Sequence, residues 1–303
     1  MDRSTAGFDQ LTRFWLDTAP ARGVVTRLDE SLMRSLADHS YPEPVKSMLR
    51  QMTGACVMLA SNLKQPATIV MQVQGSGAVP LMCVEATQAL TFRAYANVRE
   101  DAVIPADSTL SAMVDPASAG RFVLTIDPEV GQMYQSIVAM EDTSVAKILE
   151  GYLINSQQTD TRVWLREDGE AIEAAILERL PDRHEGEDFK RWLAMAALMD
   201  DTFAQPFMPF PFDEWLRMTF VGEDVRVHPA KIVSFACPCS LDRVLNALKL
   251  VGIDELLPIA DEEGEIKTQC EFCGARYVVS RSQLLSLFTR ADAGDSSSAR
   301  TLH

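Results

Sequence analysis

The most constraining feature of this chain is a set of four cysteines that form two close pairs near the C-terminus. The pairs are Cys237-Pro238-Cys239 and Cys270-Glu271-Phe272-Cys273, with 30 residues between them. Soft thiolate ligands select zinc among the divalent ions, and four thiolates at tetrahedral geometry leave no open position for water or substrate. The spacing therefore predicts a zinc site formed by Cys237, Cys239, Cys270 and Cys273 that is structural or redox-sensitive rather than hydrolytic.

The surroundings of the cysteines support one metal-dependent module. The second pair and Gly274 have the form of a zinc knuckle, in which the glycine is free to adopt a positive φ. Such a small module has little core, so metal binding should supply much of its folding free energy. Around the cysteines the pattern predicts, in order, a helix, a strand, a second strand and a final helix, at Leu241–Val251, Glu265–Gln269, Tyr277–Val279 and Gln283–Phe288.

Other residues that could be mistaken for a site are better explained as structure. Cys56 lies on the apolar face of a helix and Cys83 in a strand, so both should pack as small apolar residues. His228 precedes the first pair, but four sulfurs already complete a zinc shell. Gly75-Ser76-Gly77 lacks the following residues of a phosphate-binding loop and should be a turn.

Composition limits the classes of function. The net charge of −15 argues against broad contact with nucleic acid, because that affinity depends on cationic side chains. No stretch approaches the roughly 20 apolar residues of a membrane helix, and we expect no membrane association and a cytoplasmic location. Thiols stay reduced in that compartment, which favours metal ligands or redox sensors over structural disulfides.

The pattern of apolar residues in the first 180 positions predicts a body built on an antiparallel sheet. Short amphipathic segments at 8–17 and 28–38 lead to a helix that begins near Val45. Alternating apolar residues then predict strands and one further helix. The predicted strands lie at 69–73, 79–84, 90–98, 121–126, 133–140, 161–165 and 171–180, and the helix at 145–154.

A second informative feature is an aromatic segment between the body and the cysteines. Two helix faces are predicted there, with Pro206, Pro209 and Pro211 between them. Short helices with this much apolar surface must pack against another apolar surface, and the neighbouring sheet of the body is the candidate. Whether the segment is permanently packed or can be released is left open by its composition. The residues predicted to form a client-binding or switch surface are Phe189, Trp192, Met195, Met199, Phe203, Phe207, Phe210, Phe212, Trp215 and Phe220.

These residues together resemble the redox-regulated 33 kDa heat-shock chaperone family, also called the 33 kDa chaperonin. The two cysteine pairs and Gly274 fit the family's Cys-x-Cys and Cys-x-x-Cys motifs and their separation, and Tyr41-Pro42-Glu43-Pro44-Val45 and Gln72-Val73-Gln74-Gly75 agree as well. The resemblance covers nearly the whole chain. One departure is the stretch 203–212, which is richer in aromatic residues and proline than we expect of the family.

The resemblance implies a chaperone without enzymatic turnover that holds unfolding proteins and needs no ATP. In the reduced form one Zn²⁺ per chain is bound by the four cysteines and the connecting segment is folded. Oxidants form two disulfides, by position Cys237–Cys239 and Cys270–Cys273, release zinc and unfold the segment. Four cysteines permit three pairings. The partners implied are unfolded or partly unfolded client proteins, with a homodimer of the oxidised form left open.

The complete expectation is an α+β chain: an N-terminal antiparallel-sheet body with helices, a helical connecting segment and a small C-terminal zinc-binding α+β module. The boundaries are 1–181 for the body, 182–229 for the connecting segment, 230–290 for the zinc module and 291–303 for a disordered tail. The alternative is a zinc-ribbon regulatory or nucleic-acid-binding protein with a structural zinc. A third reading, an enzyme with a zinc tail, lacks any constellation of catalytic residues.

Overall fold

The computed structural model describes residues 8–115, 120–140, 144–181, 186–207 and 210–294. The chain divides into two compact units, Met1–Ala236 and Cys237–His303. Both units combine helices with antiparallel strands, which confirms the α+β class predicted from the sequence.

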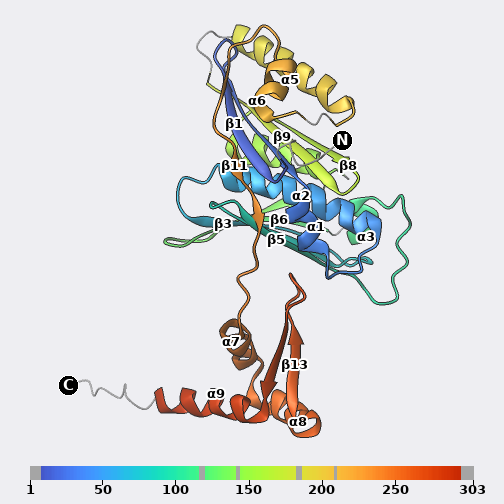
Figure 1. Cartoon of the computed structure of the whole chain (residues 1–303), viewed down its shortest axis with the longest axis vertical. Helices are drawn as coiled ribbons and strands as arrows, with labels where there is room; N and C mark the ends of the chain where they lie inside the picture. The colour runs from blue at the N-terminus through green and yellow to red at the C-terminus, as the bar shows by residue number, and fades with distance from the viewer. Residues whose placement is uncertain (1–7, 116–119, 141–143, 182–185, 208–209, 295–303) are drawn as a thin grey trace, which may run out of the picture. The chain divides into compact units, whose positions relative to one another are not determined.

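Two six-stranded sheets form the framework of the larger unit (Figure 1). Sheet A has the order β10-β1-β2-β9-β8, with β11 also paired to β1, and sheet B has the order β12-β5-β4-β3-β6-β7. The strands of sheet A are β1 (Gln10–Leu16), β2 (Ala21–Leu28), β8 (Thr161–Asp168), β9 (Ala171–Arg179), β10 (Val225–Val227) and β11 (Lys231–Ile232). The strands of sheet B are β3 (Ala67–Gln74), β4 (Leu81–Thr87), β5 (Thr91–Asn97), β6 (Arg121–Pro128), β7 (Tyr134–Ala139) and β12 (Ser234–Phe235).

The helix α2 (Glu43–Ser61) lies between the two sheets and explains why this body has one large core (Figure 1). Pro44 occupies its first turn, where a missing N–H does no harm. Residues on every side of the helix are buried, as expected of a helix covered all round. Cys56 is fully buried among them, which confirms the prediction that it packs in the core.

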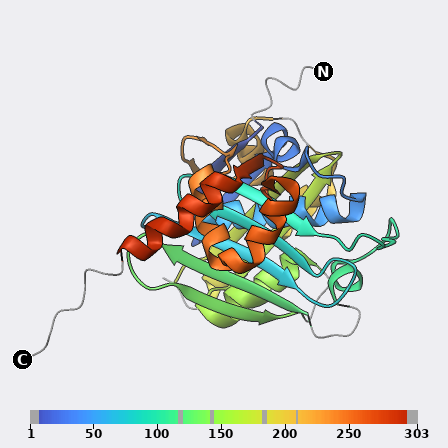
Figure 2. The same cartoon turned by 90° about the horizontal axis from the view of Figure 1, so that it is seen from below.

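Sheet B carries the rest of the predicted strand pattern, and Figure 2 views its strands side by side from below. Gly75 directly follows β3, and an added Cβ there would lie 2.1 Å from the backbone oxygen of Val114, so only glycine fits this close approach. The turn predicted at Gly75-Ser76-Gly77 leads into β4 and not into a helix. Cys83 in β4 is buried as predicted. The smaller helices of the unit are α1 (Glu30–Leu36), α3 (Leu110–Val114) and α4 (Val145–Gln157).

Several elements differ from the prediction. The amphipathic segment 8–17 forms the strand β1, and β2 was not predicted. The strands predicted as one antiparallel sheet are divided between two sheets, and β12 joins β5 in parallel. β2 is buried along nearly its whole length because sheet A is covered on both faces, so it lacks the alternation on which strand prediction relies.

The connecting segment contains two helices, α5 (Glu187–Ala204) and α6 (Phe212–Thr219), that cover the face of sheet A opposite α2 (Figure 1). Pro206 and Pro211 lie between them as predicted, and Pro209 falls outside the described residues. After α6 the chain returns to the sheets through β10, β11 and β12.

The smaller unit has its own core around the hairpin of β13 (Glu265–Gln269) and β14 (Arg276–Ser280). Its helices are α7 (Leu241–Val251), α8 (Ile253–Glu263) and α9 (Arg281–Gly294). Ser240 caps α7 by accepting a hydrogen bond from the Arg243 amide at 3.3 Å. The bounds predicted for α7 and β13 are confirmed. α8 was not predicted, because Pro258 interrupts its pattern.

Two predicted boundaries are corrected. The module was expected to begin at 230, but β11 and β12 pair with β1 and β5, so the division falls between Ala236 and Cys237. The tail was expected from 291, but α9 continues to Gly294, since the two alanines there favour helix and extend the preceding turns. The remainder of the tail lies outside the described residues.

Candidate metal centre and docked segment

The four cysteines of the C-terminal unit converge. Their Sγ atoms all lie within 4.8 Å of one another. Cys237 and Cys270 are 3.7 Å apart and Cys239 and Cys273 are 3.3 Å apart, sulfur to sulfur, and no cysteine is in a disulfide. Four sulfurs about 2.3 Å from a central zinc would be separated by about 3.8 Å, so the cluster fits a tetrahedral ion. The predicted convergence of these residues is confirmed, whereas the identity of the metal stays a prediction.

A tight turn positions the second pair. Gly274 has a φ of +68°, as predicted for a knuckle glycine. Its amide donates to the carbonyl of Cys270 at 2.9 Å, and the Cys270 amide donates to the carbonyl of Ala275 at 2.9 Å. These bonds close the loop between β13 and β14 and direct both sulfurs of the pair to one side.

The sulfurs perturb one another. Partial burial acts to raise the pKa of Cys239, but hydrogen bonds from Tyr277 and the neighbouring thiols outweigh it and lower that pKa. Burial raises the pKa of Cys273, and its bonds with the other three sulfurs raise it further. The bond to Cys239 raises the pKa of Tyr277 to about 12. Negative charges on sulfurs this close together would repel one another, so a bound cation would be stabilising at the centre of the cluster.

Cys56, Cys83 and His228, which were not predicted to be metal ligands, lie in the larger unit. Cys56 and Cys83 are buried in the core of the larger unit, and burial raises the pKa of both thiols. His228 belongs to the larger unit, where its ring lies 4.5 Å from that of Trp15. It is not part of the metal-ligand cluster found among the described residues.

The predicted switch surface is mostly buried against sheet A. Trp192, Met195, Met199, Phe212, Trp215 and Phe220 form a core cluster with residues of β1, β2, β8 and β9 that include Phe14, Val25, Trp164 and Leu177. Phe203 and Phe210 pack at its edge. Phe189 differs from the others, because 39% of it is exposed and it lies beside Trp192 and the guanidinium of Arg179.

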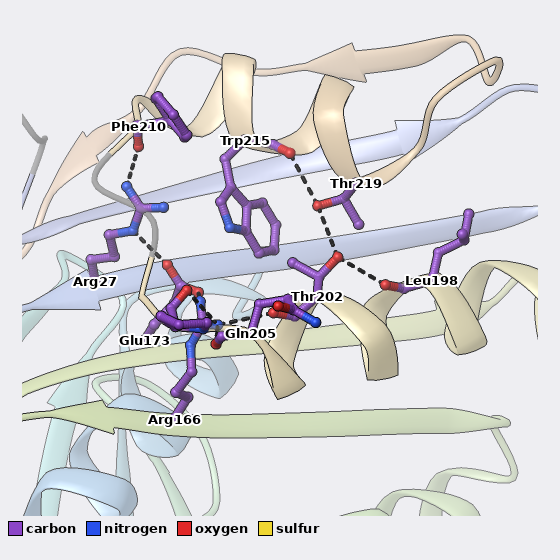
Figure 3. Close-up of polar contacts among 10 residues, drawn as sticks. Arg27, Arg166, Glu173, Leu198, Thr202, Gln205, Phe210, Trp215 and Thr219 are labelled. Atoms are coloured by element: carbon purple, nitrogen blue, oxygen red, sulfur yellow. Dashed lines mark hydrogen bonds and ion pairs between the residues drawn. The ribbon is translucent and has the colours of Figure 1, made fainter.

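Polar contacts hold the junction between α5 and α6 (Figure 3). Arg166 of β8 donates to the carbonyl of Gln205, to that of Thr202 at 2.9 Å and to that of Pro206 at 3.4 Å. Arg27 of β2 donates to the carbonyl of Phe210. Both guanidinium groups share the carboxylate of Glu173, which is fully buried.

The same guanidinium groups lie against aromatic rings. Arg27 is 4.8 Å from the ring centre of Phe212 and 5.4 Å from that of Phe207. Arg166 is 5.0 Å from Phe203 and 5.4 Å from Phe207. The stretch that departs from the expected family pattern is therefore the stretch these two arginines contact.

The sequence analysis missed Arg27, Arg166 and Glu173. A signal was available: Glu173 interrupts the apolar run of β9, and a charge in a buried strand requires a partner. The identity of the partner could not be read, because Arg27 and Glu173 are 146 positions apart and pair only through the β2–β9 register.

Comparison with known proteins identifies the family. The family model described as Hsp33 protein matches residues 9–280. The chain belongs to the Hsp33 family. The 33 kDa chaperonin of Chromobacterium violaceum is 36% identical over 92% of this chain and 94% of its own length. The 33 kDa chaperonin of Methylobacillus flagellatus is 34% identical over 93% of this chain and 94% of its own length. The crystal structure of the 33 kDa chaperonin from Thermotoga maritima has a TM-score of 0.76 at 17% identity and covers 94% of this chain and 99% of that one.

Membership of the Hsp33 family confirms the resemblance drawn from the cysteine motifs. The matched relatives are named 33 kDa chaperonins, and the family supports a chaperone role for this chain. No helix within the described residues is long and apolar enough to cross a membrane.

Proposed function

We propose that this chain is a redox-regulated chaperone that holds unfolding proteins without ATP. In its latent form the four cysteines are reduced and hold one zinc ion, and the connecting segment is docked on sheet A. The observation that supports this most directly is a complete four-sulfur cluster in a chain whose large aromatic surface is covered by its own segment.

The metal, when bound, would supply folding free energy to the module. Among the described residues of the module, six fully or nearly buried ones make up its core, which is small for independent stability. Cys237, Cys239, Cys270 and Cys273 would be its ligands, and they are half-buried and thus accessible to small oxidants. Losing these ligands would remove the main constraint on the module.

Oxidation supplies the switch. For each disulfide, two cysteines together give two electrons and two protons to a peroxide, which is reduced to two molecules of water. The proposed pairs are Cys237–Cys239 and Cys270–Cys273. Disulfide sulfurs are no longer thiolate ligands, so the module loses its metal and its fold, and the connecting segment then leaves sheet A.

The released surfaces would bind clients. The residues proposed to bind are those of the segment together with the sheet A residues they cover. The partners are unfolded or partly unfolded proteins in the cytoplasm, and two oxidised chains are proposed to associate through the same exposed surface. The net charge of −15 keeps such a chain soluble and disfavours nucleic acid as a partner.

Light scattering tests this function. A chemically unfolded client is diluted into buffer without ATP, with the chain either reduced and zinc-loaded or oxidised by peroxide under mild heat. Suppression of scattering by the oxidised chain alone is the expected result. Equal suppression by both forms would mean a constitutive chaperone with a structural metal, and suppression by neither would reject the chaperone function.

A further inference from the structure

Beneath the connecting segment, sheet A presents two arginines that donate hydrogen bonds to backbone carbonyls of the segment. The partners of Arg166 in the segment are three backbone carbonyls, and Arg27 contacts a fourth. Every polypeptide offers such carbonyls. The further contacts are with aromatic rings, which guanidinium groups bind by stacking.

The location of the carbonyls strengthens the interaction. The carbonyls of Gln205 and Pro206 directly follow the end of α5, where carbonyls lack helical partners and carry partial negative charge, and the Thr202 carbonyl also accepts from the Gln205 amide at 3.2 Å. Arg166 therefore caps α5 from another element. A client with exposed carbonyls at a helix end or turn offers the same groups.

Burying the charges of Arg27 and Arg166 costs desolvation free energy. Arg27 and Glu173 have no exposed side-chain area, and 10% of Arg166 is exposed. Because one carboxylate is shared by two cations, the carbonyl dipoles and ring faces of the segment supply further compensation for their desolvation. When the segment leaves, this compensation is lost, and the two cations stand within the apolar surface formed by residues such as Phe14 and Trp164.

We propose that Arg27 and Arg166 form a docking site for aromatic polypeptide segments that expose backbone carbonyls at a helix end or turn, and that the chain's own segment occupies this site in the latent form. This rests on the proposed function and specifies the chemistry of the client: aromatic residues a few positions apart around an interruption between helices. Phe203 at the end of α5, Phe207 between the helices and Phe212 at the start of α6 are the built-in example.

The first experiment uses the reduced, zinc-loaded full-length chain. Hydrogen exchange of the amides in α5 and α6 is compared between wild type, Arg166→Gln and Arg166→Lys. Arg93→Gln is the matched control, because Arg93 is also a partly buried, ion-paired arginine but pairs with Glu85 on sheet B. We expect Arg166→Gln to speed exchange in the segment at least tenfold, Arg166→Lys to fall between, and Arg93→Gln to have no effect there. Unchanged exchange in Arg166→Gln while α2 stays protected would overturn the proposal.

The second experiment measures binding in trans to the oxidised full-length chain. The probe is a labelled peptide with the sequence of residues 200–216, and its control replaces the phenylalanines with leucines. We expect the wild type to bind the aromatic peptide at least tenfold more tightly than Arg166→Gln does, and more tightly than it binds the leucine peptide. Equal binding by wild type and variant contradicts the site.

The two hypotheses fail in different ways. An oxidised chain that suppresses client aggregation but ignores the peptide leaves the chaperone function intact and removes this docking site. A chain that suppresses no aggregation removes the chaperone function, and the exchange experiment still decides whether Arg166 holds the segment.

Discussion

Replacing Trp215 with alanine should release the connecting segment without oxidation. Trp215 is fully buried between sheet A and α5, and its ring meets that of Phe203 edge-on at 6.0 Å. Removing a buried tryptophan costs about 3–5 kcal/mol. Its indole N–H has no acceptor among the described residues, so no hydrogen bond is lost and the lower value of about 3 kcal/mol applies.

A loss of about 3 kcal/mol raises the opening constant of the segment by roughly 100-fold, because each 1.4 kcal/mol is a factor of ten. The core of the larger unit around α2 does not include Trp215, so the loss should be local. Native-state trypsin cleavage after Arg217 in α6 reports this opening.

The expected result is cleavage at Arg217 that is about 100 times faster in the reduced Trp215→Ala chain, together with chaperone activity in the absence of oxidant. Leu193→Ala is the matched control, because Leu193 lies in the same segment and is 42% exposed. An unchanged cleavage rate, or an equal increase at sites in α2 and sheet B, would refute the reasoning that α5 and α6 form a separately releasable unit.

The site and the core give four further predictions. Chelation of the metal, or Cys270→Ser, should abolish the fold of the C-terminal unit while the larger unit keeps its protected amides; a dispersed spectrum of the unit in the metal-free chain would contradict this. Burial raises the pKa of Cys83 to about 12 and that of Cys56 well above its usual range, so iodoacetamide at pH 8 should modify neither in a metal-free chain whose larger unit is folded, while it modifies the four others. Because the folded-state pKa of Cys83 exceeds its ordinary value of 9.0, its contribution to stability is complete below pH 9 and declines as the pH rises toward 12, which thermal melts at pH 8 and 10.5 would detect. Gly75→Ala should lower stability by about 1–3 kcal/mol, because the new Cβ meets the Val114 carbonyl, whereas Gly151→Ala in α4 has open space and should raise it by about 0.5–1 kcal/mol.

The four-cysteine cluster could be predicted from the sequence because its determinants are local. Two cysteines one residue apart, two more in a knuckle and Gly274 specify their own turn chemistry, and only the meeting of the pairs required the fold. α7 and β13 were predicted to the residue for the same reason, since a cap at Ser240 and a regular pattern mark them.

What the sequence could not provide was long-range pairing. β2 is buried on both faces and has no alternation, and its Arg27 finds Glu173 through a strand that follows much later in the chain. β11 and β12 are two residues each, too short for a pattern, and exist because β1 and β5 offer free edges. The aromatic segment was recognised as a covering element, but the arginines that hold its carbonyls were not.

In the proposed switch, the state of the four sulfurs in one unit controls whether α5 and α6 stay docked on sheet A. Hydrogen exchange of the full-length chain is measured in the reduced, zinc-loaded form and again after oxidation by peroxide. We expect oxidation to remove the protection of α5 and α6 while α2 and the strands of sheet B stay protected. Oxidation that forms the disulfides but leaves α5 and α6 as protected as in the reduced chain would contradict it.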